Sequence, residues 1–209
     1  MIKDSKAMHP REMLRAIENA LPKNSIVSTD IGNICSVSNS YLRFDEPRSM
    51  LAAMSFGNCG YAFPVAVGAK IASPNRPVFA YVGDGAWGIS LNELLTCARE
   101  KIGVTVILFN NGQWGAEKKN HVDFYSRRYQ GVELVNPSWA AVAKSFGCEG
   151  VTVDKVGDIG AAIQAAVKNQ AEGKTTVIEM MVTKELGDPF RRDALSKPVR
   201  HLDKYKSFV

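Results

Sequence analysis

The sequence has no long hydrophobic run, few cysteines and only three histidines. Because a membrane-spanning helix needs about 20 consecutive apolar residues and no such run occurs, we predict no membrane segment. Residues 1–6 contain no apolar core of a secretory signal, so we expect a cytoplasmic location. The cysteines are scattered and form no CxxC pair, which argues against a zinc site and against a disulfide framework. They are Cys35, Cys59, Cys97 and Cys148.

The basic residues do not form a stripe interleaved with aromatic residues. Lysine and arginine number 26 against 21 acidic residues, which gives a net charge of +5. Such an excess suits small anionic ligands as well as it suits nucleic acid. Without a basic and aromatic stripe we expect no nucleic-acid partner and favour small anions. With 45% hydrophobic residues, the 209-residue chain can bury one substantial core.

Short β-branched and apolar runs alternate with amphipathic stretches along most of the chain. The expected strands are 25–29, 78–82, 104–109, 150–153 and 175–182. The expected helices are 9–21, one of about ten residues after the turn 30–33, 65–72, 90–99, 138–146 and 159–171. This alternation predicts an α/β fold, a doubly wound and mostly parallel sheet with helices on both faces. We divide the chain into a polar leader (1–8), a domain (9–185) and a basic C-terminal extension (186–209).

Two of the expected strands end in small and polar residues. One leads into Gly83, Asp84 and Gly85, and the next leads into Asn111, which follows Asp84 by 27 positions. The carboxyl ends of neighbouring parallel strands meet at the edge where open α/β sheets bind ligands. Carboxylate and carboxamide oxygens suit Mg²⁺, which fills its octahedral shell with water and phosphate oxygens. The glycines allow the backbone to approach a phosphate, so this edge is a predicted Mg²⁺ and phosphate site.

Three further segments have features of a binding site. The turn Asp30–Asn33 lies between a strand and a helix start, a natural anion site, although the same residues also serve ordinary turn geometry. The glycines at 57, 60 and 68 permit close backbone contact, either with a flat ligand or with another helix. Residues 114–129 are polar, aromatic and charged, and we expect them to form a loop that lines or covers the site.

Together these motifs resemble the thiamine-diphosphate-binding domain of the acetolactate synthase and pyruvate decarboxylase superfamily. The resemblance rests on the spacing from Gly83-Asp84-Gly85 to Asn110-Asn111 within a βαβ unit. It extends through 53–64, 113–120 and 186–195, and covers 8–209. It implies the thiamine-diphosphate-binding fold, as the diphosphate-binding domain, with thiamine diphosphate and Mg²⁺ as cofactors.

The resemblance implies a role for each matching residue. The metal ligands would be the side chains of Asp84 and Asn111 and the backbone carbonyl of Gln113. The carbonyl of Gly57 would accept a hydrogen bond from the cofactor's 4′-amino group, and the amide of Cys59, where relatives carry a bulkier apolar residue, would bind the pyrimidine ring. The residues implied at the diphosphate are Gly32, Asn33, Gly83, Gly85 and Ala86.

Beyond the metal motif, the sequence offers two candidates for acid and base chemistry. Glu117 matches a position that holds an active-site glutamate in some related decarboxylases, and we expect it to handle protons or to orient substrate. His121 is a second candidate, because histidine exchanges a proton near neutral pH. The cations expected to meet anionic substrates are Lys118, Arg127, Arg191 and Arg192.

The resemblance also implies a partner. In the superfamily, the glutamate that activates the cofactor lies in a separate pyrimidine-binding domain and reaches the site across a subunit interface. No such domain is recognisable in this sequence, so we expect a homo- or hetero-oligomer, such as a dimer, in which another domain supplies that glutamate. An isolated chain should not turn over. The implied activity is that of an acyltransferase that converts sulfoacetaldehyde and phosphate into acetyl phosphate and sulfite.

Other interpretations remain. The chain fits the thiamine-binding subunit of a two-chain 2-oxo-acid decarboxylase that acts on a compound such as sulfopyruvate. It also fits a non-catalytic module that uses the fold for cofactor binding or assembly. A dinucleotide site is disfavoured, because the turn lacks GxGxxG and the acidic residue that follows it about 20 positions later in dinucleotide-binding folds.

Overall fold

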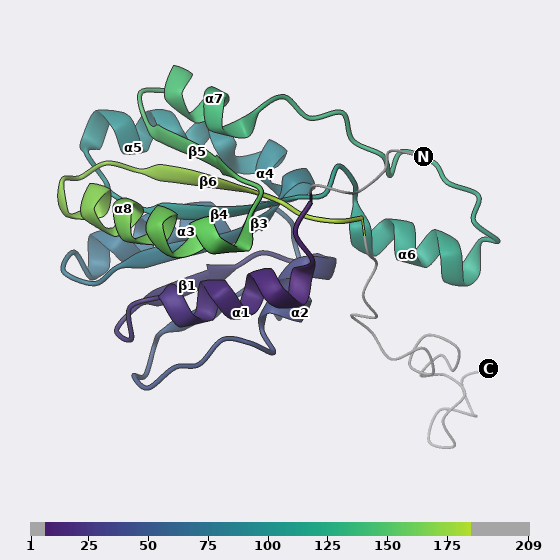
Figure 1. Cartoon of the computed structure of the whole chain (residues 1–209), viewed down its shortest axis with the longest axis horizontal. Helices are drawn as coiled ribbons and strands as arrows, with labels where there is room; N and C mark the ends of the chain where they lie inside the picture. The colour runs from purple at the N-terminus through teal and green to yellow at the C-terminus, as the bar shows by residue number, and fades with distance from the viewer. Residues whose placement is uncertain (1–6, 185–209) are drawn as a thin grey trace.

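The computed structural model describes residues 7–184, apart from the side chain of Ile34, and places helices on both faces of a six-stranded sheet (Figure 1). Neighbouring strands all pair in parallel, in the order β2-β1-β3-β4-β6-β5. The predicted α/β fold with a doubly wound sheet is therefore confirmed. The strands are β1 (Ile26–Thr29), β2 (Met50–Ala52), β3 (Val78–Gly83), β4 (Thr105–Asn110), β5 (Glu149–Val153) and β6 (Thr176–Met181).

Two layers of helices bury the two faces of the sheet. One face packs against α1 (Pro10–Ala20), α2 (Asn33–Ser38) and α8 (Ile159–Ala171), the last of which follows the short 3-10 helix η2 (Val156–Asp158). The other face packs against α3 (Ala62–Ala72), α4 (Asp84–Ser90), α5 (Leu94–Glu100) and α7 (Trp139–Ser145). Because β3 and β4 are covered on both faces, their sequences are continuous apolar runs without alternation.

The direction of the chain across the sheet changes between β1 and β3. From β1 the chain passes through α2 to β2 on one side, whereas from β3 it passes through α4 and α5 to β4 on the other side. Connections that leave neighbouring strands in opposite directions open a crevice at the carboxyl edge of the sheet, where such folds bind ligands. The turn after β1 and the junction of β3 with α4 both lie at this crevice. Helix α6 (Gly115–Phe124) extends beyond the same edge (Figure 1).

Several elements differ from the sequence-based expectations. The helix expected at 90–99 is divided between the last residue of α4, the 3-10 helix η1 (Leu91–Glu93) and α5, and helical structure begins earlier, at Asp84 directly after β3. Residues 114–129, expected as a loop, fold into α6 over their first two thirds. The helix from Asn33 has six residues rather than about ten. The three-residue β2 was not predicted, because so short a strand carries no readable pattern.

The start of the described chain pairs with its end. Met8 is 4% exposed, its amide donates to the carbonyl of Met181 at 2.8 Å, and its carbonyl accepts from the amide of Thr183 at 3.1 Å. Met8, which we expected in a polar leader, is therefore paired with Val182, directly after the end of β6. No helix within residues 7–184 is both long enough and apolar enough to cross a membrane.

Candidate functional site

Asp84 lies at the crevice, at the point where β3 passes directly into α4. Its side chain is 3% exposed, and its Oδ2 accepts hydrogen bonds from the amide of Gly112 at 2.8 Å and from the carboxamide of Asn136 at 2.6 Å. Burial raises the pKa of this carboxyl group, and the bond from Asn136 and the neighbouring backbone amides partly oppose the rise. These donors are all neutral dipoles, so the full charge of a bound cation would further stabilise the carboxylate.

Three helices begin at this crevice: α2 at Asn33, α4 at Asp84 and α6 at Gly115. The starts of α2 and α6 are in close contact, since a Cβ added at Gly115 would lie 3.2 Å from the Cβ of Asn33. The first amides of a helix have no partner within the helix, and together they carry a partial positive charge. Three such starts around one space favour an anion there.

A cavity of about 200 Å³ lies among the three helix starts. It is lined by every residue predicted to bind the metal or the cofactor: Gly32, Asn33, Gly57, Cys59, Gly83, Asp84, Gly85, Ala86, Asn111 and Gln113. Glu117 also lines it, together with Ile31, Cys35, Phe109, Trp114, Gly115 and Ala116. The fold therefore brings the predicted residues of four separate segments together around one space.

The glycines of the cavity have distinct reasons to be glycine. Gly57 has a φ of +76° and Gly32 a φ of +147°, conformations that other residues rarely adopt. Gly85 is required by a close contact, because a Cβ there would lie 2.7 Å from Cδ2 of Trp114. Cys59 is half-buried, and burial raises the pKa of its thiol, so it lines the cavity as a small neutral group.

Asp30 organises the opposite wall of the crevice. The side chain is 2% exposed, its Oδ1 accepts hydrogen bonds from the amides of Ile31 and Gly60, and its Oδ2 accepts one from the amide of Ala62, each 3.0 Å long. Burial raises the pKa of this carboxyl group, and the amide bonds oppose the rise. Because these bonds join the end of β1 to the start of α3, they fix the loop that carries Gly57. We had predicted only a turn here.

Residues 132–136, which we call the strap, run antiparallel to the loop around Gln113. Gln113 pairs with Glu133, and two backbone hydrogen bonds of 2.9 Å, one to the carbonyl of Gly112 and one from the amide of Trp114, join the strap to the loop. The side chain of Gln113 is also buried. The strap therefore fixes the backbone of the residue whose carbonyl is a predicted metal ligand.

Lys118, predicted to meet an anionic substrate, is engaged by the strap. Its ammonium group donates to Oε1 of Gln113 at 3.0 Å, forms an ion pair with Glu133, and lies 5.3 Å from the centroid of the Tyr129 ring. Lys184 binds the other oxygen of the same glutamate at 2.8 Å. Lys118 is not among the residues that line the cavity, so in this arrangement its charge stabilises the strap.

The remaining predicted residues divide into two groups. Glu117 stands in the first turn of α6 and lines the cavity. His121 lies farther along α6, where its ring contacts those of Tyr125 and Tyr129 and lines a separate open hollow. Arg127 is exposed beyond the end of α6 and does not line the cavity. The other two predicted cations, Arg191 and Arg192, lie outside the described residues.

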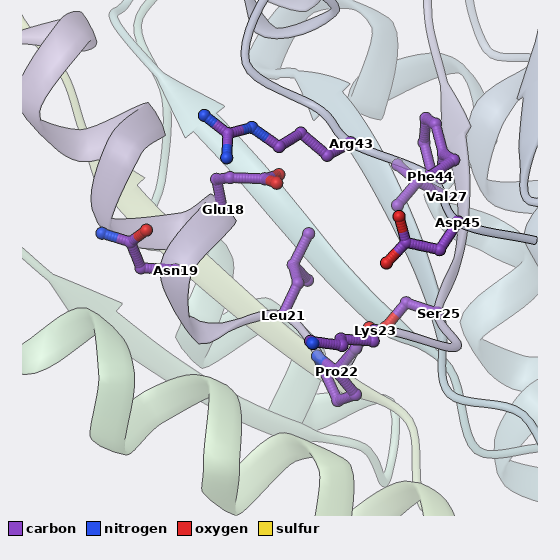
Figure 2. Close-up of a pocket in the computed structure, with 10 residues that line it drawn as sticks. All are labelled: Glu18, Asn19, Leu21, Pro22, Lys23, Ser25, Val27, Arg43, Phe44 and Asp45. Carbon is purple, nitrogen blue, oxygen red and sulfur yellow. Dashed lines mark hydrogen bonds between the residues drawn. The ribbon is translucent and has the colours of Figure 1, made fainter.

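A larger cavity, of about 350 Å³, lies at the other end of β1, between the last turn of α1 and residues 43–45 (Figure 2). Its charged lining groups, which are of both signs, are Glu18, Lys23, Arg43 and Asp45. No helix starts there, and no predicted site residue lines it. The smaller cavity at the carboxyl edge is therefore the candidate site.

Asn136 is the main site residue that the sequence did not reveal. Asn136, Pro137 and Ser138 were interpreted together as a helix entry signal. In the structure Ser138 alone caps α7, accepting a hydrogen bond from the amide of Ala141 at 3.3 Å. Asn136 instead points to Asp84, which lies 52 positions earlier in the chain. An asparagine before a proline is so typical of turns that it carries no signal of such a contact.

The donor set fits Mg²⁺ held together with a diphosphate. One carboxylate, one carboxamide and one backbone carbonyl are oxygen ligands, and they leave positions in an octahedral shell for phosphate oxygens and water. Within residues 7–184 no three histidine, cysteine, aspartate or glutamate side chains are grouped so that they could hold a metal ion by themselves, so this part of the chain offers no zinc-type cage. The amides at the helix starts provide donors for the phosphate oxygens.

Comparison with known proteins agrees with this geometry. Residues 30–180 match the thiamine pyrophosphate enzymes, in their C-terminal TPP binding domain. The chain is 62% identical over 203 residues to sulfoacetaldehyde acetyltransferase of Alcaligenes xylosoxydans xylosoxydans, and 59% identical to that of Castellaniella defragrans. Each alignment covers 97% of this chain but only 34% of the relative, so the chain spans about a third of the length of these curated relatives. The solved thiamine diphosphate-dependent 4-hydroxybenzoylformate decarboxylase of Rhodococcus jostii RHA1 shares the fold, with a TM-score of 0.80 and 24% identity over 88% of this chain and 34% of that one.

Proposed function

Because the chain belongs to the thiamine pyrophosphate enzymes and corresponds to their C-terminal TPP binding domain, we propose that it is this domain of a sulfoacetaldehyde acetyltransferase. The proposed reaction converts sulfoacetaldehyde and phosphate into acetyl phosphate and sulfite. The observation that carries the proposal is the 62% identity to a sulfoacetaldehyde acetyltransferase over 97% of this chain. The cavity at the carboxyl edge supports it, because the predicted cofactor residues line one space there.

We propose that the chain holds the diphosphate end of the cofactor through Mg²⁺. Asp84 and Asn111 would bind the metal through their side chains, and Gln113 through its backbone carbonyl. Support comes from the burial of Asp84 among neutral donors and from the strap that fixes the backbone of Gln113. The amides that would bind phosphate oxygens lie at the starts of α2 and α4, in the residues Gly32, Asn33, Gly85 and Ala86, with Gly83 at the end of the preceding strand.

The reactive end of the cofactor would lie against the loop after β2. The carbonyl of Gly57 would accept a hydrogen bond from the 4′-amino group, and the amide of Cys59 would face the pyrimidine ring. Bound thiamine diphosphate supplies the nucleophilic carbon and the electron sink, while the protein supplies position and charge. Asp30 supports this role, because its bonds to two amides of the same loop keep the loop in place.

We assign proton handling or substrate orientation to Glu117 before His121. Glu117 lines the cavity, whereas the ring of His121 packs against two tyrosines and lines a different hollow. Because Lys118 is already paired with a glutamate, we propose that arginines meet the sulfonate and phosphate groups of the substrates. These are Arg127, Arg191 and Arg192.

We also propose an oligomer, such as a dimer, in which a pyrimidine-binding domain supplies the activating glutamate. The support is the share of the relatives that the chain covers, since 34% of their length leaves room for such a domain elsewhere in the complete protein. The cytoplasmic location stays a prediction from the sequence.

The decisive experiment combines the chain with its pyrimidine-binding domain and supplies sulfoacetaldehyde, phosphate, thiamine diphosphate and Mg²⁺. We expect equal amounts of sulfite and acetyl phosphate, and neither product from the Asp84→Asn variant. Sulfite without acetyl phosphate, or carbon dioxide released from sulfopyruvate, would contradict the proposal and favour a decarboxylase. Cofactor binding without turnover of either substrate would favour a non-catalytic module.

A further inference from the structure

A row of hydrogen-bonded polar side chains joins Asp84 to a second buried carboxylate, Glu179 on β6. Nδ2 of Asn136 donates to Oδ2 of Asp84 at 2.6 Å and to Oδ1 of Asn110 at 2.9 Å. Nδ2 of Asn110 in turn donates to Oε1 of Glu179 at 2.8 Å. Asn110 is 7% and Glu179 2% exposed, whereas Asn136 is half-buried. Two carboxamides thus connect the predicted metal ligand to a glutamate that lies outside the cavity.

The far oxygen of Glu179 is held by donors that come from other elements. Its Oε2 accepts hydrogen bonds from the hydroxyl of Thr152 at 3.0 Å, from the backbone amide of Ala140 at 3.2 Å and from the hydroxyl of Ser138 at 3.4 Å. A hydroxyl can rotate its hydrogen, but a backbone amide in α7 cannot turn. The atom that faces Ala140 must therefore be an acceptor.

This arrangement determines which way each carboxamide faces. The NH₂ group of Asn110 donates to Oε1 of Glu179, so its oxygen faces Asn136. That oxygen requires a donor, so Asn136 must turn its own NH₂ group toward Asn110. The same NH₂ group carries a second hydrogen, which reaches Asp84. Glu179 therefore sets, through Asn110, the orientation of the Asn136 carboxamide whose NH₂ group binds Asp84.

We propose that Asn136 is a positioning residue for the Mg²⁺ site, held by Asn110 and Glu179 so that it engages Oδ2 of Asp84 and presents Oδ1 to the metal. The bonds from Asn136 and from Gly112 both end on Oδ2, and Oδ1 receives neither of them. Mg²⁺ demands near-ideal octahedral geometry, so a carboxylate that can rotate binds it less well. The proposal rests on the proposed function, because it assumes that Asp84 is a metal ligand.

The first test is Asn136→Leu, which keeps the approximate size of the side chain and removes its donors. Thiamine diphosphate binding is followed by quenching of tryptophan fluorescence while Mg²⁺ is titrated, since Trp114 lines the cavity. Removal of a hydrogen bond to a metal ligand typically weakens metal affinity about 10- to 100-fold, and we expect a rise of this size in the Mg²⁺ concentration at half-maximal binding. Thermal unfolding without metal is measured in parallel. A merely structural role would lower the melting temperature and leave the Mg²⁺ requirement unchanged.

The second test acts at the far end of the row. In Glu179→Gln, the amide of Ala140 forces the new carboxamide to keep its oxygen on that side, which turns its NH₂ group toward the NH₂ group of Asn110. Asn110 must then flip, and Asn136 must flip with it, so that an oxygen faces Oδ2 of Asp84. We expect a weaker Mg²⁺ affinity although Glu179 does not line the cavity.

Thr152→Val is the matched control for the second test. It removes one hydrogen bond from the same glutamate without reversing any donor, because the bonds from α7 remain. We expect its Mg²⁺ requirement to equal that of the wild type. A loss of Mg²⁺ affinity as large as that of Glu179→Gln would contradict the proposal that Glu179 sets the orientation of Asn110 and Asn136.

The outcomes separate the two proposals. If the wild-type chain with its pyrimidine-binding domain binds thiamine diphosphate without needing Mg²⁺, the proposed function fails and the positioning role fails with it. If the wild type needs Mg²⁺ but Asn136→Leu and Glu179→Gln show the wild-type requirement, the positioning role alone is refuted. A raised requirement in both variants, with Thr152→Val unchanged, supports it.

Discussion

Replacing Asp84 by asparagine should abolish Mg²⁺-dependent cofactor binding without unfolding the chain. Both long-range hydrogen bonds to Asp84 end on a single oxygen, Oδ2, at 2.8 Å from Gly112 and 2.6 Å from Asn136. The carbonyl oxygen of an asparagine can occupy that position and keep both bonds. The substitution also removes a buried charge whose pKa is raised by burial. The variant should therefore be at least as stable as the wild type in the absence of ligand.

The magnitude follows from linkage between ligand binding and folding. A ligand that binds only the folded state stabilises it by about 2.7 kcal/mol when its concentration is 100 times its dissociation constant. For a domain of this size, about 1 kcal/mol corresponds to about 2–4 °C in melting temperature. With Mg²⁺ and thiamine diphosphate at that concentration, we expect a rise of about 5–11 °C for the wild type and no Mg²⁺-dependent rise for Asp84→Asn.

Thermal unfolding, monitored by circular dichroism, measures both the melting temperature without ligand and its rise with Mg²⁺ and thiamine diphosphate. The chain itself can be used, because all the predicted metal and diphosphate residues line one cavity within it. Asp154, which is exposed, provides the control, since Asp154→Asn should keep the full wild-type shift. The reasoning is refuted if Asp84→Asn keeps a Mg²⁺-dependent rise, if the wild type shows none, or if the variant is unfolded without ligand.

Three further predictions concern the same walls of the cavity. Gly85→Ala should lower the free energy of unfolding by about 1–3 kcal/mol, because the new methyl group would overlap the ring of Trp114. Gly88→Ala in the same helix is the control and should not lower it, because a Cβ there would have no neighbour within 4 Å. Asp30→Asn should destabilise the chain by about 1–3 kcal/mol in urea unfolding, because both carboxylate oxygens accept hydrogen bonds from backbone amides and the NH₂ group of an asparagine would face one of these donors. Stability equal to that of the wild type would contradict this. The pKa of Asp84 is raised in the folded state, so its contribution to stability is present below its usual value of 3.8 and is lost as pH rises through the folded value. Without metal, the stability advantage of Asp84→Asn should thus be largest at neutral pH and should shrink on acidification, which unfolding at several pH values will test.

The two buried aspartates illustrate why residue type and spacing reveal only part of a site. Asp84 stands out in the sequence because glycines flank it and a strand precedes it. Asp30 has a similar setting and was predicted only as part of a turn. What each carboxylate does depends on the backbone amides that bind it. Gly60 binds Asp30 and Gly112 binds Asp84, and both are distant in the chain from the aspartate that they bind, so residue type and spacing do not reveal them.

The sequence by itself determined the fold class and the family. Continuous apolar runs specify strands covered on both faces, and the change to small and polar residues marks the strand ends, because burial and backbone approach are local requirements. The Asp84 and Asn111 motif follows from the same local rules. The assignment of the chain to the thiamine pyrophosphate enzymes is confirmed by the match over residues 30–180.

Tertiary structure alone decided how the site is supported. The order of the strands places the switch in chain direction between β1 and β3, and no local pattern encodes that order. The pairing of Lys118 with Glu133, the ring of Trp114 over Gly85, and the row from Asp84 to Glu179 all join residues 15 to 95 positions apart in the sequence. Such contacts depend on which elements pack together, so they emerge only when the whole sheet has formed.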